Sequence, residues 1–386
     1  MAAALRVPGI DVGEYLTKKQ KPDTDLSADW AQVEQLYNKK LWHQLTLKLA
    51  EFVKNPDMQK GDNLIDLYEN FITTFENKIN PLTLIEIVSH VTHQYKDKKQ
   101  AVAFLETMEP KVKANDQAWT LCKVLQGQIY LDTYEDMENT ARIISEVENT
   151  LEDVDGVTPV HGKFYKLASD YYRLRGPLSR YYRAGLRYVG CCGGGLELPT
   201  IVRMSMAKSL ALAAVFAEDV YDLNELLAHP ILDTLESTKD EWAMLLVKVV
   251  ARGDLEGYLK LRASITPVNM LEGEDKLKRK IAILCLMEMA YNRSPSQRTI
   301  SFAEISAESR VEAGEVELLI MKAMAEKLIR GSIDQVSSNV TITWVKPRAL
   351  TRAQICSLAS RLADWCALVN TAADMLESTA TDVLTY

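Results

Sequence analysis

The sequence has 386 residues, enough for roughly two or three domains at about 100–200 residues per domain. Lys and Arg number 45 against 53 Asp and Glu, so the net charge is −8, and 47% of the residues are hydrophobic. This composition is typical of a globular protein and excludes a wholly disordered chain or a collagen-like fibre.

The first 26 residues contain Pro8, Gly9 and Gly13, followed by a polar run, and they predict a mobile N-terminal tail. From 27 to 292, apolar residues recur at steps of three and four, with Gly, Pro, Asn and Asp between the runs. This spacing predicts successive amphipathic helices that pack on one another. The helices form pairs at TPR-like or HEAT-like intervals without a strict consensus, so we predict an irregular α-solenoid.

The pattern changes after residue 293. Short helices are predicted around 303–309 and 315–328, followed by two β-rich segments at 329–336 and 340–345 with a turn between them. Two helices followed by a hairpin is the order of a winged helix, which we place at 293–346. The predicted fold class is therefore mostly α, a solenoid followed by a winged helix and one terminal helix.

The terminal segment, 347–386, contains a heptad seam. Its apolar residues step by three and four without a break: Ile355, Leu358, Leu362, Trp365, Val369, Ala372 and Leu376. Such a narrow stripe is typical of a helix that packs against partner helices. Spacing alone leaves two possibilities open, a helix that folds back on its own domain or one that joins a bundle with other chains.

Catalytic, nucleotide and metal motifs were not found. The glycine-rich segment 190–195 lacks the Lys-Ser/Thr and the preceding strand of a phosphate loop, so we interpret it as a connection between helices. His90 and His93 lie at i and i+3, but no third ligand has suitable spacing. His43 and His161 could be catalytic only in a triad whose other residues are distant in the sequence. We interpret both as ordinary structural or surface histidines. We expect no enzyme activity, cofactor or metal.

Nucleic-acid binding is considered because winged helices often place their second helix in the major groove of DNA. Residues 312–327 carry four Glu and two Lys, and this balance of −2 disfavours phosphate contacts. Tyr171 to Tyr188 is the better signal, with five tyrosines, five arginines and no acid. We favour the interpretation that the tyrosines fill a seam between helices while the arginines extend to solvent. The basic run 276–280 lies beside acidic residues and is interpreted as a solvated face of mixed charge.

The compartment is predicted from what the sequence lacks. No apolar stretch approaches the ~18–20 uncharged residues of a membrane span, and the first ten residues do not resemble a secretion signal. The cysteines show no disulfide spacing and are predicted to be reduced: Cys122, Cys191, Cys192, Cys285, Cys356 and Cys366. We therefore expect a protein of the cytoplasm and nucleus, without membrane or nucleic-acid partners.

The order of helical repeats, winged helix and terminal helix resembles the PCI architecture of the proteasome lid, the signalosome and a translation-initiation complex. Five stretches are similar to PCI subunits of the proteasome lid in particular: Leu36 to Thr46, Asp66 to Ile72, Leu284 to Met289, Glu315 to Leu319 and Thr343 to Arg348. They span nearly the whole chain from about residue 26.

This resemblance implies a non-catalytic scaffold subunit of the lid of the 19S regulatory particle, acting in ubiquitin-dependent protein degradation. It implies that the last part of the solenoid forms the helical half of the PCI module. Winged helices of the family pack side by side, so Val340, Ile342 and Trp344 on the second β-rich segment would lie at an edge that meets a neighbouring subunit.

The resemblance also implies that the terminal helix joins a bundle containing the two MPN-type subunits. The contacting residues would be Ile355, Leu358, Leu362, Trp365, Val369 and Leu376. The implied partners are other PCI subunits, the MPN-type subunits and a ubiquitin receptor near the solenoid. Three alternatives remain at this point: a PCI subunit of another large complex, a nucleic-acid-binding winged-helix protein, and a hydrolase with residues distant in sequence.

Overall fold

The computed structural model describes residues 12–13, 15–16, 27–59, 61–134, 136–152, 154, 156–193, 199–236, 238–264, 274–293, 298–350 and 352–379. The chain divides into two compact units, residues 1–175 and 176–386. No helix within the described ranges is long and apolar enough to cross a membrane.

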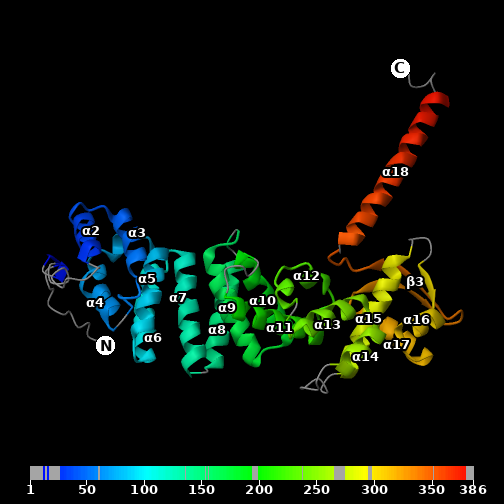
Figure 1. Cartoon of the computed structure of the whole chain (residues 1–386), viewed down its shortest axis with the longest axis horizontal. Helices are drawn as coiled ribbons and strands as arrows, with labels where there is room; N and C mark the ends of the chain where they lie inside the picture. The colour runs from blue at the N-terminus through cyan, green and yellow to red at the C-terminus, as the bar shows by residue number, and fades with distance from the viewer. Residues whose placement is uncertain are drawn as a thin grey trace. The chain divides into compact units, whose positions relative to one another are not determined.

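Unit 1 is a series of α-helices in which neighbours along the chain pack on one another (Figure 1). The helices are α2 Ser27–Asn38, α3 Trp42–Phe52, α4 Asn63–Asn70, α5 Pro81–Gln94, α6 Lys98–Val112, α7 Asp116–Ile129, α8 Met137–Glu152 and α9 Pro159–Arg175. Helix α7 contacts α5 and α6 as well as α8 and α9, so each helix buries its apolar stripe against others. The predicted helical repeats are confirmed.

Side-chain caps fix where several of these helices begin. Asn80 accepts a hydrogen bond from the backbone nitrogen of Leu82 at 3.0 Å, and Pro81 follows as the first helical residue. Asp97 and Asn115 cap α6 and α7 in the same way. These contacts satisfy backbone donors that the first turn of a helix leaves without partners.

The core of unit 1 extends into the segment predicted to be a tail. Tyr15 and Leu16 are buried, and the Tyr15 ring lies 6.1 Å from the ring of Trp30, which in turn contacts Phe52 at 4.9 Å. The prediction of a mobile tail is therefore wrong at these two residues, because their apolar side chains complete the core beside α2 and α3. The other residues of that segment lie outside the described ranges, apart from Val12 and Gly13.

Unit 2 begins with further helices and ends in a small sheet. Its helices are α10 Leu178–Cys191, α11 Thr200–Phe216, α12 Asn224–Leu227, α13 Glu241–Arg252, α14 Leu255–Ser264, α15 Glu274–Asn292, α16 Phe302–Ser309, α17 Val316–Ala325 and α18 Arg352–Thr379. Helix α11 packs between α10 and α13, and α15 contacts α13 on one side and α16, α17 and the sheet on another. Helix α15 thus joins the helical part of unit 2 to the sheet.

The sheet has three antiparallel strands, β1 Thr299–Ser301, β2 Ile329–Asp334 and β3 Asn339–Val345, in the order β1-β3-β2. Together with α16 and α17 these strands form the predicted winged helix. Its core contains Ile300, Ile320 and Val340, which are fully buried. The sequence did not predict β1, which is only three residues long.

The position of β3 corrects one expectation. The segment 340–345 was expected to be an edge strand, but β3 is central and pairs with both neighbours. Val340 and Ile342 are 0% and 1% exposed, so neither side chain is available to another subunit in this fold. The strands at the margins of the sheet are β1 and β2.

Gly253 ends α13 in the left-handed region, with φ of 71°, and lies against α15. A Cβ at this position would come within 2.4 Å of the backbone nitrogen of Cys285. We expect Gly253→Ala to lower the free energy of unfolding by about 3 kcal/mol, because both the φ angle and the contact exclude a side chain. Urea unfolding measures the loss.

The matched control for this prediction is Gly314→Ala, because no atom lies within 4 Å of the added Cβ and the φ angle is not positive. We expect its free energy of unfolding to change by less than ~1 kcal/mol. Equal stabilities of the two variants would contradict the prediction.

Lys280 of α15 is buried at the C-terminal end of α11. Its ammonium group donates to the carbonyl oxygens of Ala214, Val215 and Ala217 at 2.7, 3.0 and 2.8 Å. The end of a helix leaves carbonyl groups without internal partners and carries partial negative charge, so a cation fits there. Burial lowers the pKa of Lys280 to about 7.

The other lysines of the basic run 276–280 are paired at the surface. Lys276 lies 2.6 Å from Glu218 and Lys278 lies 2.9 Å from Glu274. The interpretation as a solvated mixed-charge face is therefore correct for these two lysines and wrong for Lys280.

Candidate protein-interaction surface

Helix α18 carries the most extensive exposed apolar surface in the described part of the chain. It has 28 residues, which corresponds to about 42 Å at 1.5 Å per residue. Every residue from Ile355 to Thr379 is exposed. The predicted seam residues are between 42% and 63% exposed: Ile355, Leu358, Leu362, Trp365, Val369 and Leu376. The structure thus gives no support to a helix folded back on its own unit.

The apolar face of α18 is wider than the predicted seam. Leu368 and Met375 are both 69% exposed and flank the seam one position before its residues. On the other flank are small or weakly polar residues, Ala359, Cys366 and Ala373, while Asp364 and Asp374 occupy the opposite face. The expectation of a narrow stripe was therefore wrong, since the uncharged face includes these flanking positions as well as the seam. A face of this width suits contact with more than one helix, as in a bundle.

The chain is anchored to unit 2 just before α18 begins. The guanidinium of Arg348 lies 2.5 Å from the carboxylate of Glu288 on α15. The backbone nitrogen of Ala349 donates to the carboxylate of Asp222 at 3.0 Å. The Arg348 side chain is largely buried, so this ion pair resists solvent competition better than a surface pair does. The stretch Thr343 to Arg348, noted for its family resemblance, thus fixes where α18 starts.

Of the three residues predicted at the edge of the sheet, only Trp344 is accessible in part. The guanidinium of Arg330 on β2 lies 4.7 Å from the centre of the Trp344 ring, a cation–π contact between the two strands. Arg330 and Ser332 of β2 are exposed, and Val336 at the hairpin tip is almost fully exposed. The margin formed by β2 and the hairpin is therefore open to another chain, a feature that strand propensity alone could not assign.

The outward face of α17 is apolar where a DNA-binding winged helix would carry basic side chains. Leu318 and Met321 are more than half exposed. Lys322 is the one basic residue of α17, and Glu317 is the one acidic residue. Counterion release needs several Lys or Arg side chains on phosphates, so this face is poorly suited to nucleic acid.

The Tyr/Arg segment supports the interpretation that we favoured. Tyr181 and Tyr182 of α10 are buried in unit 2, and Arg180, Arg183 and Arg187 are exposed. Burial raises the pKa of the Tyr182 phenol, with Glu225 and Asp222 adding to the rise. The buried rings of Tyr181 and Tyr182 cannot stack on bases, and the other three tyrosines of the segment are half-buried.

The candidate histidines are not brought into a catalytic arrangement. His43 is exposed on α3. His161 is buried, and its Nδ1 atom lies 3.1 Å from the backbone nitrogen and 2.8 Å from the hydroxyl of Thr158, so it helps to fix the start of α9. Burial lowers the pKa of both His90 and His93, which disfavours the charged ring. The described residues contain no group of three or more His, Cys, Asp or Glu placed to hold a metal ion.

The cysteines are free thiols in the structure, as predicted. Cys122 and Cys285 are buried, and burial raises the pKa of Cys122 to about 12 and that of Cys285 to about 11. A thiol with a raised pKa is a poor nucleophile at neutral pH. The predicted connection at 190–195 lies within the described residues only as far as Gly193.

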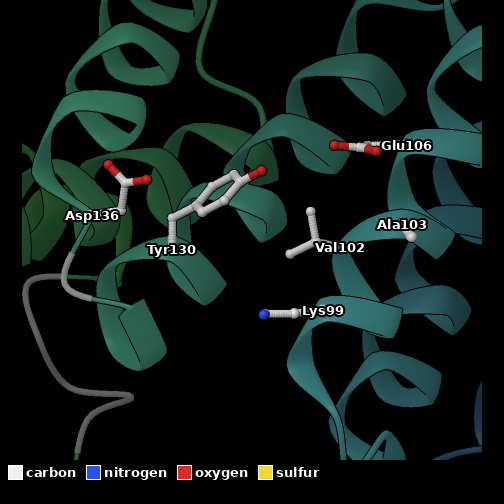
Figure 2. Close-up of a pocket in the computed structure, with 6 residues that line it drawn as sticks. All are labelled: Lys99, Val102, Ala103, Glu106, Tyr130 and Asp136. Atoms are coloured by element: carbon white, nitrogen blue, oxygen red, sulfur yellow. The ribbon is translucent and has the colours of Figure 1, made fainter.

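A pocket of about 540 Å³ lies between α6 and the segment that follows α7 (Figure 2). Its lining is Lys99, Val102, Ala103 and Glu106 from α6, facing Tyr130 and Asp136. The Asp136 carboxylate accepts bonds from the backbone and side-chain nitrogens of Asn139 at 3.1 and 2.7 Å, so it serves as a cap for α8. Burial raises the pKa of Tyr130. These six residues include no activated nucleophile and no general base with a partner.

Helical repeats joined to a winged helix are the architecture of a PCI-domain protein. Two family models match the chain: PSD13 N-terminal repeats at residues 29–247 and the PCI domain at 260–344. Together they cover most of the helices of both units and the winged helix, and they end before α18.

Curated relatives agree over nearly the full length. The chain is 33% identical over 385 residues to 26S proteasome non-ATPase regulatory subunit 13 homolog A of Arabidopsis thaliana, covering 96% of this chain and 98% of the relative. It is 33% identical over 382 residues to subunit 13 of Dictyostelium discoideum, with the same coverage. The 26S proteasome regulatory subunit RPN9 of Saccharomyces cerevisiae is 26% identical over 366 residues, 90% of this chain and 92% of that protein. The chain belongs to the family of 26S proteasome non-ATPase regulatory subunit 13.

Proposed function

We propose that this chain is a non-catalytic structural subunit of the lid of the 19S regulatory particle, and that it supports ubiquitin-dependent protein degradation through protein contacts. The observation that carries the proposal is the exposed apolar face of α18. A face of eight large side chains from Ile355 to Leu376 is unusual on a monomer surface and marks a protein interface. Family membership supplies the complex in which that interface would be used.

The C-terminal helix is the principal contact in this proposal. The seam residues Ile355, Leu358, Leu362, Trp365, Val369 and Leu376 would be buried among helices of other lid subunits, including the MPN-type subunits. Burying six such side chains contributes roughly 9 kcal/mol at about 1.5 kcal/mol each, before the costs of association. The width of the face supports a bundle in preference to a pair of helices.

The winged helix is the second contact. Trp344, Arg330 and the β2 margin would meet the winged helix of a neighbouring PCI subunit, while Val340 and Ile342 support that surface from within the core. Unit 1 would lie near a ubiquitin receptor. The chain would work in the cytoplasm and the nucleus.

Purification of the particle tests the proposal. The endogenous chain, tagged at its N-terminus and isolated under native conditions, is expected to carry the lid subunits at equal stoichiometry, as measured by quantitative mass spectrometry. It is expected to co-migrate with peptidase-active 26S particles on a native gel. Recovery as a free monomer, or in a complex without proteasome subunits, would overturn the proposal.

A further inference from the structure

One stretch with family resemblance, Leu36 to Thr46, is not used by the contacts proposed above. It forms the tight turn between α2 and α3. The backbone nitrogen of Lys40 donates to the carbonyl of Tyr37 at 3.0 Å, and that of Leu41 donates to the carbonyl of Leu36 at 3.1 Å. These two bonds form a Schellman-type end to α2 and hold the turn in one conformation.

Lys40 occupies the left-handed position of this turn, with φ of 55°. Glycine is the usual residue there because any Cβ is strained. A lysine at this position places a charge at the tip of the turn, where the C-terminal end of α2 also favours a cation. The side chain is exposed, as is that of Lys39.

An aromatic cluster of Tyr37, Trp42 and Phe75 packs beside the turn. The Trp42 ring stacks on Phe75 with centroids 5.6 Å apart and meets the edge of Tyr37 at 5.8 Å. The ammonium group of Lys78 lies 4.5 Å from the centre of the Trp42 ring. A third exposed lysine is therefore held beside the turn by a rigid ring system.

We name Lys39, Lys40 and Lys78, with the exposed leucines Leu41 and Leu47, the basic corner. None of its three lysines forms an ion pair with a described carboxylate, whereas Lys48 and Lys111 nearby pair with Asp29 at 2.8 Å and Glu76 at 2.7 Å. Residues 36–48 include no Asp or Glu. Three exposed lysines without a carboxylate partner among the described residues give this corner a local positive charge on a chain whose net charge is −8.

The two exposed leucines of the basic corner indicate which class of partner it binds. Leu41 and Leu47 are about half exposed and lie on the outward side of the turn and of α3. Phosphate alone would gain nothing from them, but a peptide with carboxylates beside an apolar side chain would contact both parts. We propose that the basic corner binds an acidic segment of another protein chain that carries an apolar residue among its Asp and Glu side chains.

Direct binding tests this inference without reference to the proteasome. The probe is a fluorescein-labelled peptide of alternating Glu and Leu, titrated with the purified full chain in an anisotropy assay. Lys39→Ser, Lys40→Gly and Lys78→Ser combined should weaken binding at least tenfold, and raising the salt from 50 to 300 mM should weaken wild-type binding similarly. Lys40→Gly relieves the strained φ angle, so lost binding would not reflect lost folding.

The matched control replaces Lys96, Lys99 and Lys113 with Ser, because these exposed lysines of unit 1 lie outside the basic corner. Its affinity should stay within twofold of wild type. Equal effects of the two triple variants, or tighter binding of a single-stranded oligonucleotide than of the peptide, would overturn the inference.

Zero-length cross-linking tests the same surface in the assembled particle, and this arm rests on the proposed function. Carbodiimide joins lysine amines to carboxylates in contact, so Lys48 should link to Asp29 within the chain as an internal control. Lys39 or Lys40 should link to an Asp or Glu of another subunit. Links confined to this chain, or none, would overturn the inference. Absence of the chain from purified particles would instead overturn the proposed function.

Discussion

A chain that ends at Ala349 should fold and yet fail to enter the regulatory particle. The truncation removes α18, whose residues from Ile355 onward are exposed and support no core of either unit. It keeps the anchor formed by Arg348 with Glu288 and by Ala349 with Asp222. We therefore expect unchanged thermal unfolding of the remainder and at least a hundredfold loss of particle-bound protein, measured by quantitative mass spectrometry of purified 26S particles.

Paired substitutions test whether incorporation depends on the apolar face of α18 or only on the presence of the helix. Leu362→Asp with Val369→Asp places two charges in the seam and should reduce incorporation as strongly as the truncation does. Ser360→Asp with Ala367→Asp places the same charges on the opposite face and should leave incorporation near the wild-type level. Native incorporation of the seam variant would show that α18 is not the principal contact.

Lys280→Met should cost about 3–5 kcal/mol of stability, the other large effect that we expect. Methionine fills a similar volume but leaves the carbonyl oxygens of Ala214, Val215 and Ala217 buried without a donor. Lys276→Met is the control, since Lys276 pairs only at the exposed surface with Glu218 and should change stability by less than ~1 kcal/mol. Guanidinium unfolding at pH 7 measures both values, and similar losses would contradict the assignment.

The pH dependence of Lys280 has a definite sign. Its pKa is lowered from 10.5 to about 7 by burial, so above pH 7 the unfolded chain binds more protons at this residue than the folded chain does. The stability that wild type holds over Lys280→Met should therefore rise between pH 7 and 9, by on the order of 1–2 kcal/mol. A difference that stays flat over this range would mean that the three carbonyls keep the ammonium charged.

The spacing of apolar residues in the sequence predicted those helices and strands that bury a single apolar stripe. The heptad steps of Ile355 through Leu376 predicted the terminal helix, and the order of helices and hairpin predicted the winged helix. Periodicity does not report which strand is central, because alternating burial is the same for an edge strand and for β3. Strand β1 was missed for a related reason, since its three residues are too few to show a period.

Other features were missed because the burial of a residue differs from what its type or its sequence neighbours predict. Lys280 lies on the buried stripe of α15, between Leu277 and Leu284, and a lysine at an apolar position was a signal available in the sequence. Tyr15 and Leu16 are apolar residues in a polar segment, and only tertiary contact with Trp30 accounts for their burial. The extra width of the α18 face was visible in Leu368 and Met375.

The anchor at Arg348 and Ala349 has a mechanical consequence. Only residues 350 and 351 separate the fastened backbone of Ala349 from the first residue of α18. Three steps along the backbone join Ala349 to Arg352, so the distance between these two residues cannot exceed about 10 Å. A bundle that gripped α18 and shifted by more than that distance would drag the winged helix with it or break the pair between Arg348 and Glu288. The subunit would then pass such a pull from its neighbours on to its winged helix, without any change inside its own core.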